Sequence, residues 1–172
     1  MSTASSAVLR VCLGACLAAS VAACRMPSLP SSPTENVGGA GGTNFDAEIA
    51  YCVSEINSYR SRAGKAPLAH LAEGQDFSVE AARVDGEHHE AHRYFRATNG
   101  GNGTAMAENE IPWWTLSRYG SVRTVIREGL AMMWAEGPGG GHYENMRGPY
   151  TKLGCGVFVN GNEITVVQDL GR

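Results

Sequence analysis

Histidine is scarce in this 172-residue chain, and four of its five copies lie where they could do chemistry. His88, His89 and His92 fall within five residues of one another, and His142 follows a run of glycines. Two imidazoles four residues apart share one helix face, as the zinc ligands do in the HExxH metalloprotease motif. That motif is absent, because Glu90 lies two residues from both His88 and His92. The sequence therefore argues against a zinc peptidase of this kind.

A carboxylate precedes the fourth histidine in an unfavourable position. Glu136 ends the apolar stripe of a predicted helix, where the negative end of the helix dipole disfavours a carboxylate by about 0.3–1 kcal/mol. The glycine-rich residues 137–141 follow, and such a segment can bring His142 back beside Glu136. The sequence leaves two interpretations, a Glu136–His142 pair or an exposed and solvated carboxylate.

The helices that must position these residues follow from hydrophobic periodicity. Apolar residues at three- and four-residue steps predict helices over about 45–63, 71–84 and 122–136. Asn44 is placed to cap the first helix, and Gly64 is placed to end it. The three histidines of the cluster therefore follow the second helix, and His142 follows the third.

After Tyr150 the apolar period changes from that of a helix to that of a strand. Residues 153–159 and 163–169 predict two strands, joined as a hairpin by Asn160-Gly161-Asn162. At least one more strand is expected between residues 104 and 111. Helices followed by a hairpin predict an α+β domain, with the helices packed on a small sheet.

The amino-terminal residues 1–23 are interpreted as a secretion signal. Their apolar run, residues 11–23, has 13 residues, whereas a membrane-spanning helix needs about 20. The run ends Val21-Ala22-Ala23-Cys24, which resembles a bacterial lipobox whose cysteine is lipidated after cleavage. The alternative is an ordinary cleaved signal in which Cys24 has no role.

The next residues, 24–44, are dominated by proline, serine and glycine and predict a flexible tether of roughly 25 Å reach. The sequence thus predicts a lipidated Cys24, a tether, and one folded domain over residues 45–172. Such a protein is expected to be exported and held in the bacterial cell envelope through its lipid. In a host that sorts lipoproteins as enteric bacteria do, Arg25 rather than aspartate beside Cys24 favours the outer membrane.

The net charge bears on nucleic-acid binding, and the cysteine content bears on disulfide formation. Cleavage would leave 149 residues and remove Arg10, which changes the net charge from −3 to −4. No strongly basic surface is available, so nucleic-acid binding is excluded as a main function. Cys52 and Cys155 would be the two unmodified thiols, and export permits them to form a disulfide. Two separate buried thiols are the alternative.

Several motifs in order along the chain resemble the CAP superfamily of cysteine-rich secretory proteins, antigen 5 and pathogenesis-related 1 proteins. The resemblance covers residues 48–170, and its motifs are Ala107-Glu108-Asn109, Trp134-Ala135-Glu136, Gly141-His142-Tyr143-Glu144-Asn145 and Leu153-Gly154-Cys155-Gly156. It implies an α-β-α sandwich in which helices cover a small, mainly antiparallel sheet.

The resemblance also implies a cleft containing two histidines and two glutamates. By residue match these are His92, Glu108, Glu136 and His142, hereafter the predicted tetrad. The first histidine is ambiguous among His88, His89 and His92, and His92 is preferred because it lies nearest the loop leading to Glu108. In several family members the histidines bind a divalent metal, which implies that His92 and His142 hold zinc or another divalent cation. A metal-free hydrogen-bonded network is the alternative.

The family is known mostly for binding, which implies a ligand-binding protein rather than an enzyme. The expected ligand is lipid-like or a component of the cell envelope. One alternative is a metal-dependent hydrolase in which Glu108 or Glu136 activates water. Another is an envelope interaction protein whose tetrad is purely structural. The chain departs from the family pattern at Ala107, normally glycine, and at Glu144-Asn145, often Thr-Gln, so the family's ligand preference does not transfer.

Overall fold

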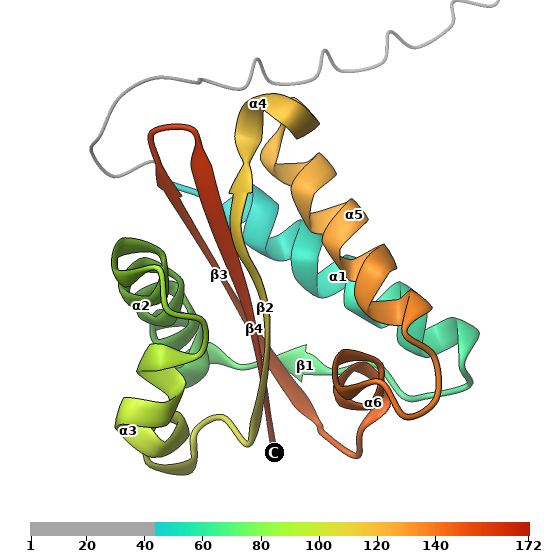
Figure 1. Ribbon diagram of the computed structural model, residues 1–172. Helices are drawn as coiled ribbons and strands as arrows, with labels where there is room; N and C mark the ends of the chain where they lie inside the picture. Colours follow the sequence, from blue (N-terminus) through green and yellow to red (C-terminus); the bar gives the residue numbers. More distant parts are fainter. Residues whose placement is uncertain (1–43) are drawn as a thin grey trace, which may run out of the picture. The chain divides into compact units, whose positions relative to one another are not determined.

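The computed structural model describes residues 44–172, which fold as helices on both faces of one sheet (Figure 1). The predicted signal peptide, the lipidated Cys24 and nearly all of the tether lie outside the described residues. The helices are α1 (Asp46–Arg62), α2 (Ala72–His88), α3 (Arg93–Gly103), α4 (Leu116–Tyr119), α5 (Val122–Ala135) and α6 (Gly141–Arg147). The strands are β1 (Ala69–His70), β2 (Ala107–Thr115), β3 (Lys152–Asn160) and β4 (Glu163–Gly171).

The sheet has the strand order β1-β3-β4-β2. β1 runs parallel to β3, and the other two pairings are antiparallel. Helices α2 and α3 cover one face, whereas α1, α5 and α6 cover the other (Figure 1). The predicted α+β class, with helices on a small and mainly antiparallel sheet, is therefore confirmed. None of the described helices combines the length and the apolar character of a membrane span.

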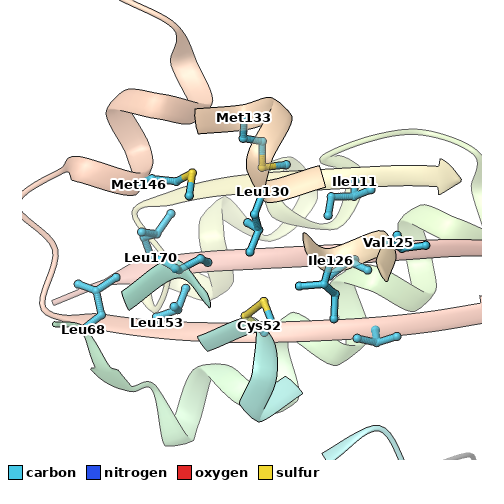
Figure 2. Close-up of a cluster of buried hydrophobic side chains, with 14 of the residues drawn as sticks. Cys52, Leu68, Ile111, Val125, Ile126, Leu130, Met133, Met146, Leu153 and Leu170 are labelled. Atoms are coloured by element: carbon cyan, nitrogen blue, oxygen red, sulfur yellow. A yellow bond between two sulfur atoms is a disulfide. The ribbon is translucent and has the colours of Figure 1, made fainter. Parts of the chain in front are cut away.

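The main hydrophobic core lies on the face covered by α1, α5 and α6 (Figure 2). Its buried members include Ile56 of α1, Leu130 of α5 and Leu153 of β3. On the same face a disulfide joins Cys52 of α1 to Cys155 of β3, with their Cα atoms 6.4 Å apart. The disulfide thus links the helical layer of α1, α5 and α6 covalently to β3, an inner strand of the sheet.

Two glycines flank Cys155 and let the other helical layer approach the sheet closely. Because side chains alternate along a strand, Gly154 and Gly156 face α2 while Cys155 faces α1. A Cβ atom at Gly156 would overlap the backbone carbonyl oxygen of Ser78 in α2. The sequence Gly-Cys-Gly therefore sets the distance to both layers at once.

A buried arginine fixes the loop that follows α6. Arg60 of α1 is 3% exposed, and burial lowers the pKa of its guanidinium. Its Nη1 donates to the carbonyl oxygens of Met146 and Gly148 at 2.9 and 3.1 Å, and its Nε donates to Ala66 at 2.9 Å. These bonds hold α6, and with it His142, against α1.

Candidate functional site

The edge strand β2 separates two groups of polar side chains by simple alternation. Glu108 and Glu110 point to the face covered by α2 and α3, where Glu110 meets the residue that precedes α3. Asn109 and Ile111 point to the opposite face, toward α6 and Gly129 of α5. Residues adjacent in the sequence therefore serve different sides of the sheet.

The first group centres on His92, which lies between α2 and α3 in a left-handed conformation, with φ of 59°. Its Nδ1 lies 2.8 Å from Oε1 of Glu108, and its backbone N–H donates to Oε2 of Glu110 at 2.8 Å. The two carboxylate side chains are 1% and 0% exposed. One ligand atom from each of the three residues lies within 4.8 Å of the other two, so His92, Glu108 and Glu110 could hold a metal ion.

Two further carboxylates adjoin these glutamates. Asp169 of β4 is directly opposite Glu108 in the strand register, and the two carboxyl groups are within hydrogen-bonding reach. The hydroxyl of Ser78 donates to Oδ2 of Asp169 at 2.7 Å. Asp85 of α2 accepts the backbone N–H of Tyr94 at 2.8 Å. Asp85 and Asp169 are each 0% exposed, so the face beneath α2 contains four buried acids.

Burial makes these acids hard to ionise. It raises the pKa of Glu108 to about 8, that of Glu110 to about 7 and that of Asp169 to about 9. Burial also raises the pKa of Asp85. Repulsion from the neighbouring carboxylates adds to the rise in pKa for Glu108 and Asp169. At neutral pH the group must therefore hold protons or a cation.

The second group pairs Glu136 with His142 on the other side of the sheet. Glu136 caps the carboxyl end of α5, and its Oε1 lies 2.5 Å from Nδ1 of His142. The backbone N–H of His142 donates to Oε2 of the same carboxylate at 3.1 Å. The bond from the imidazole holds the pKa of Glu136 below its ordinary value. About a third of each side chain is exposed, so this pair is much more accessible to solvent than the buried acids are.

The predicted tetrad thus stands in the structure as two hydrogen-bonded pairs. Among residues 44–172, the group whose ligand atoms lie close enough to hold one metal ion contains Glu110 and does not include the predicted ligand His142. Of the three candidate histidines, His92 contacts Glu108. The other two have different partners, since His88 contacts the carbonyl of Val84 and His89 contacts Glu163.

Sequence reasoning missed three members of the buried group, namely Asp85, Glu110 and Asp169. A signal was present for two of them. Glu110 is two residues after Glu108 in a strand that is otherwise largely apolar, so both carboxylates share one face. Asp169 interrupts the apolar run of the last strand. A carboxylate inside a buried strand needs a hydrogen-bond donor, a counter-ion or a metal, so its presence indicates a polar site.

The departures from the family pattern connect β2 to α6. Asn145 donates to Oδ1 of Asn109 at 2.9 Å, and Asn109 donates to the carbonyl of His142 at 3.2 Å. Glu144 accepts the backbone N–H of Gly139 at 3.2 Å. These contacts brace the glycine-rich loop that carries His142.

A hollow of about 420 Å³ lies beside α1 and β1. Its lining is largely apolar and is formed by Asp46, Ile49, Ala50, Val53, His70 and Gln75. None of the predicted tetrad lines it. The hollow lies at the amino-terminal half of α1, which directly follows the predicted tether.

Comparison with known proteins gives one clear result. The model of the CAP family, described as the cysteine-rich secretory protein family, matches residues 53–170. No curated protein matches the chain significantly.

Proposed function

The chain belongs to the CAP family of cysteine-rich secretory proteins, and from this membership we propose that it is an exported, lipid-anchored envelope protein whose domain binds a divalent cation and a lipid-like ligand. The apolar run that ends at Cys24 supports the anchor. The sequence has no Gly-x-Ser-x-Gly motif, so a serine nucleophile of that type is not expected.

The cation-binding part rests on the grouping of His92, Glu108 and Glu110. Their ligand atoms lie within 4.8 Å of one another, and imidazole with carboxylate suits zinc and several other divalent cations. Oε2 of Glu108 and Oε1 of Glu110 are buried without a hydrogen-bond donor. A buried carboxylate oxygen without a donor is costly, so the residues present fit a cation.

Each residue of the group has a defined part in such a site. The left-handed backbone of His92 directs its N–H at Glu110 while its imidazole meets Glu108, so one residue orients both carboxylates. A bound cation would neutralise the two carboxylates and supply a Lewis-acidic centre. The opposite pair, Glu136 and His142, is not required for this set.

Removing one ligand tests the cation site. The full chain, purified in detergent and stripped with chelator, is expected to take up about one equivalent of Zn²⁺, as measured by mass spectrometry of the metal content. Glu110→Gln should weaken the binding about tenfold or more, because it removes a carboxylate ligand.

The matched control is Glu136→Gln, which changes a glutamate of the predicted tetrad outside the grouped ligands and should leave the metal content unchanged. Negligible metal content in the unmodified chain would contradict the proposed cation site. Equal loss in both variants would restore the ligand set expected from the family.

The lipid-like ligand is supported by the hollow beside α1. Its volume of about 420 Å³ is within the range of small-molecule sites, and its lining is largely apolar. Ile49 and Val53 supply apolar surface from one helix face, one turn apart. A single acyl chain is the kind of ligand that such a lining favours.

A charge placed in the hollow tests this part. A dansyl-labelled fatty acid is expected to gain fluorescence on binding the full chain, and Ala50→Glu should weaken that binding about tenfold, because the acyl chain would have to desolvate a carboxylate. Ala47→Glu, an exposed site on the same helix outside the lining, serves as control. An absence of any fluorescence gain with the unmodified chain would rule the ligand class out.

A further inference from the structure

Three aromatic side chains from three helices form a continuous row across α1, α5 and α6. The ring centroids of Tyr59 and Trp134 are 5.1 Å apart, and those of Trp134 and Tyr143 are 4.7 Å apart. An arginine lies over each outer ring. The Cζ atom of Arg62 is 4.3 Å from the centroid of Tyr59, and that of Arg147 is 5.1 Å from the centroid of Tyr143. These five residues are hereafter the arginine–aromatic row.

The row lies at the surface, and its polar atoms are open to a ligand. All three rings are half-buried. Within residues 44–172, no group forms a hydrogen bond with Nε1 of Trp134 or with the hydroxyl of Tyr59 or Tyr143, and none of these atoms is buried without a partner. Buried tyrosine and tryptophan normally find such a partner, so these atoms face solvent.

The two arginines of the row have no ion-pair partner in the part of the chain that the structure describes. Five other arginines do have one, namely Arg83, Arg93, Arg96, Arg123 and Arg127. Glu144 lies three residues before Arg147 in α6, but its carboxylate accepts the N–H of Gly139 instead. Nε of Arg147 is buried without an acceptor. A buried charged donor is costly to leave unpaired, so this guanidinium suits an anionic ligand.

Two more cations lie beside the row. Arg60 binds the carbonyl of Ala66 and two carbonyls at the end of α6, which brings the exposed Lys65 close to that helix end. The exposed Arg172 donates from Nε to the carbonyl of Pro149, just beyond α6, at 3.3 Å. The net charge of the chain, −3, does not reveal this local excess of positive charge.

We propose that the arginine–aromatic row binds an acidic polysaccharide, whose sugar rings pack against the aromatic side chains and whose carboxylates meet the arginines. The planar fork of arginine matches a carboxylate, and stacking on a ring fixes its orientation. The C–H groups on one face of a sugar are weakly positive and suit the negative face of an aromatic ring. The row shares no residue with the His92 group or the hollow, so this inference goes beyond the proposed function.

The position of the row favours a polymer over the anchoring membrane. The predicted tether joins the domain at the amino end of α1, whereas Tyr59 and Arg62 lie in the last turn of this 17-residue helix, about 25 Å away. Membrane-binding faces also insert large apolar side chains. The exposed ones among the described residues, Val79, Met106 and Met132, do not belong to the row.

Binding of oligogalacturonate tests the proposal, because each of its sugar rings carries a carboxylate. Isothermal titration calorimetry on the full chain in detergent should show binding that weakens as salt is added, since exposed charges are screened. Arg147→Gln should weaken the binding about tenfold, because a hydrogen bond between charged groups is lost. Arg62→Gln, on an exposed side chain, should cause a similar loss and keeps the test independent of the fold around Arg147.

The matched control is Arg118→Gln. Arg118 also lies over a tyrosine, with its Cζ atom 5.7 Å from the centroid of Tyr119. Its helix, α4, is at the opposite end of α5 from α6 (Figure 1). This variant should leave the binding of oligogalacturonate unchanged, and a loss equal to that of Arg147→Gln would contradict the proposed site.

Other polymers define the ligand class. Neutral dextran and poly-L-glutamate should each bind about tenfold or more weakly than oligogalacturonate, because one lacks the carboxylates and the other lacks the sugar rings. Equal binding of either polymer, or no binding of oligogalacturonate, would overturn the proposal. Loss of oligogalacturonate binding when phosphatidylglycerol is added to the detergent micelles would assign the arginines to a lipid head group instead. Zn²⁺ uptake should be the same in Arg147→Gln and the unmodified chain, so this proposal and the cation site fail separately.

Discussion

Replacing Gly156 by alanine is expected to lower the free energy of unfolding by about 3 kcal/mol, as measured by urea denaturation. The added methyl group would overlap the carbonyl oxygen of Ser78. That oxygen belongs to the backbone of α2, so relief requires the helix to move away from the sheet. Moving α2 would also shift Asp85, which is one of the buried acids, and Ser78, whose hydroxyl donates to Asp169. The variant is therefore expected to lose cation affinity together with stability.

Gly141→Ala is the matched control for this prediction. A Cβ atom at Gly141 meets no atom within 4 Å, and the residue begins α6, where alanine is a good helix former. Its effect on the free energy of unfolding should stay within about 0.5 kcal/mol. Equal stability of the Gly156 and Gly141 variants would show that α2 does not pack against β3 as closely as described.

Raising the pH from about 5 to about 9 in the presence of chelator is expected to destabilise the protein progressively. In the folded chain the pKa values of Glu108, Glu110 and Asp169 are raised to about 8, 7 and 9, from ordinary values of 4.5, 4.5 and 3.8. At a pH between the ordinary and the raised pKa of a group, the folded state binds more protons than the unfolded state. The stabilisation is thus complete below the ordinary pKa values and is lost as the pH rises through the raised ones. Each group contributes up to about 1.4 kcal/mol per pH unit.

The measurement is the free energy of unfolding at a series of pH values. Asp169→Asn should flatten the fall, because one proton-binding group is removed from the buried set. Saturating cation should oppose the fall at high pH, since it binds the deprotonated acids. A free energy of unfolding that rises with pH in chelator would contradict the buried and uncompensated state of these carboxylates.

Much of the fold could be predicted from the periodicity of the sequence. The helices α1 and α5 and the hairpin β3–β4 were expected from long apolar patterns of one period, and α2 was expected from a weaker one. The end of α1 was predicted closely, since Gly64 follows it with φ of +66°. At its start Asn44 accepts the N–H of Asp46, but the N-cap residue is Phe45 rather than the predicted Asn44. The short elements α3, α4, α6 and β1 were missed. They owe their conformation to tertiary contacts, such as those of Arg60 with the end of α6.

The site was less predictable than the fold for a geometric reason. Spacing along the chain pointed to Glu136 and His142, because one short loop joins them. The contact between Glu108 and Asp169 depends on the register of β2 against β4, which periodicity does not determine. Alternation along β2 places Glu108 and Asn109 on opposite faces, but it does not say which helices cover each face. The motifs therefore named four residues but did not say which of them lie together, and in the structure His92 contacts Glu108 while His142 contacts Glu136.

The disulfide between Cys52 and Cys155 constrains the order of events during folding. Both cysteines are 0% exposed, and they are 103 positions apart in the sequence. An oxidant cannot reach either thiol once α1 has docked on the sheet, so the bond must form before docking is complete. A chain that folds while reduced would keep its thiols trapped until α1 opens again. Oxidation of the finished domain would then proceed at the rate of that opening, whatever the concentration of oxidant, and the bond would be resistant to external reductants for the same reason.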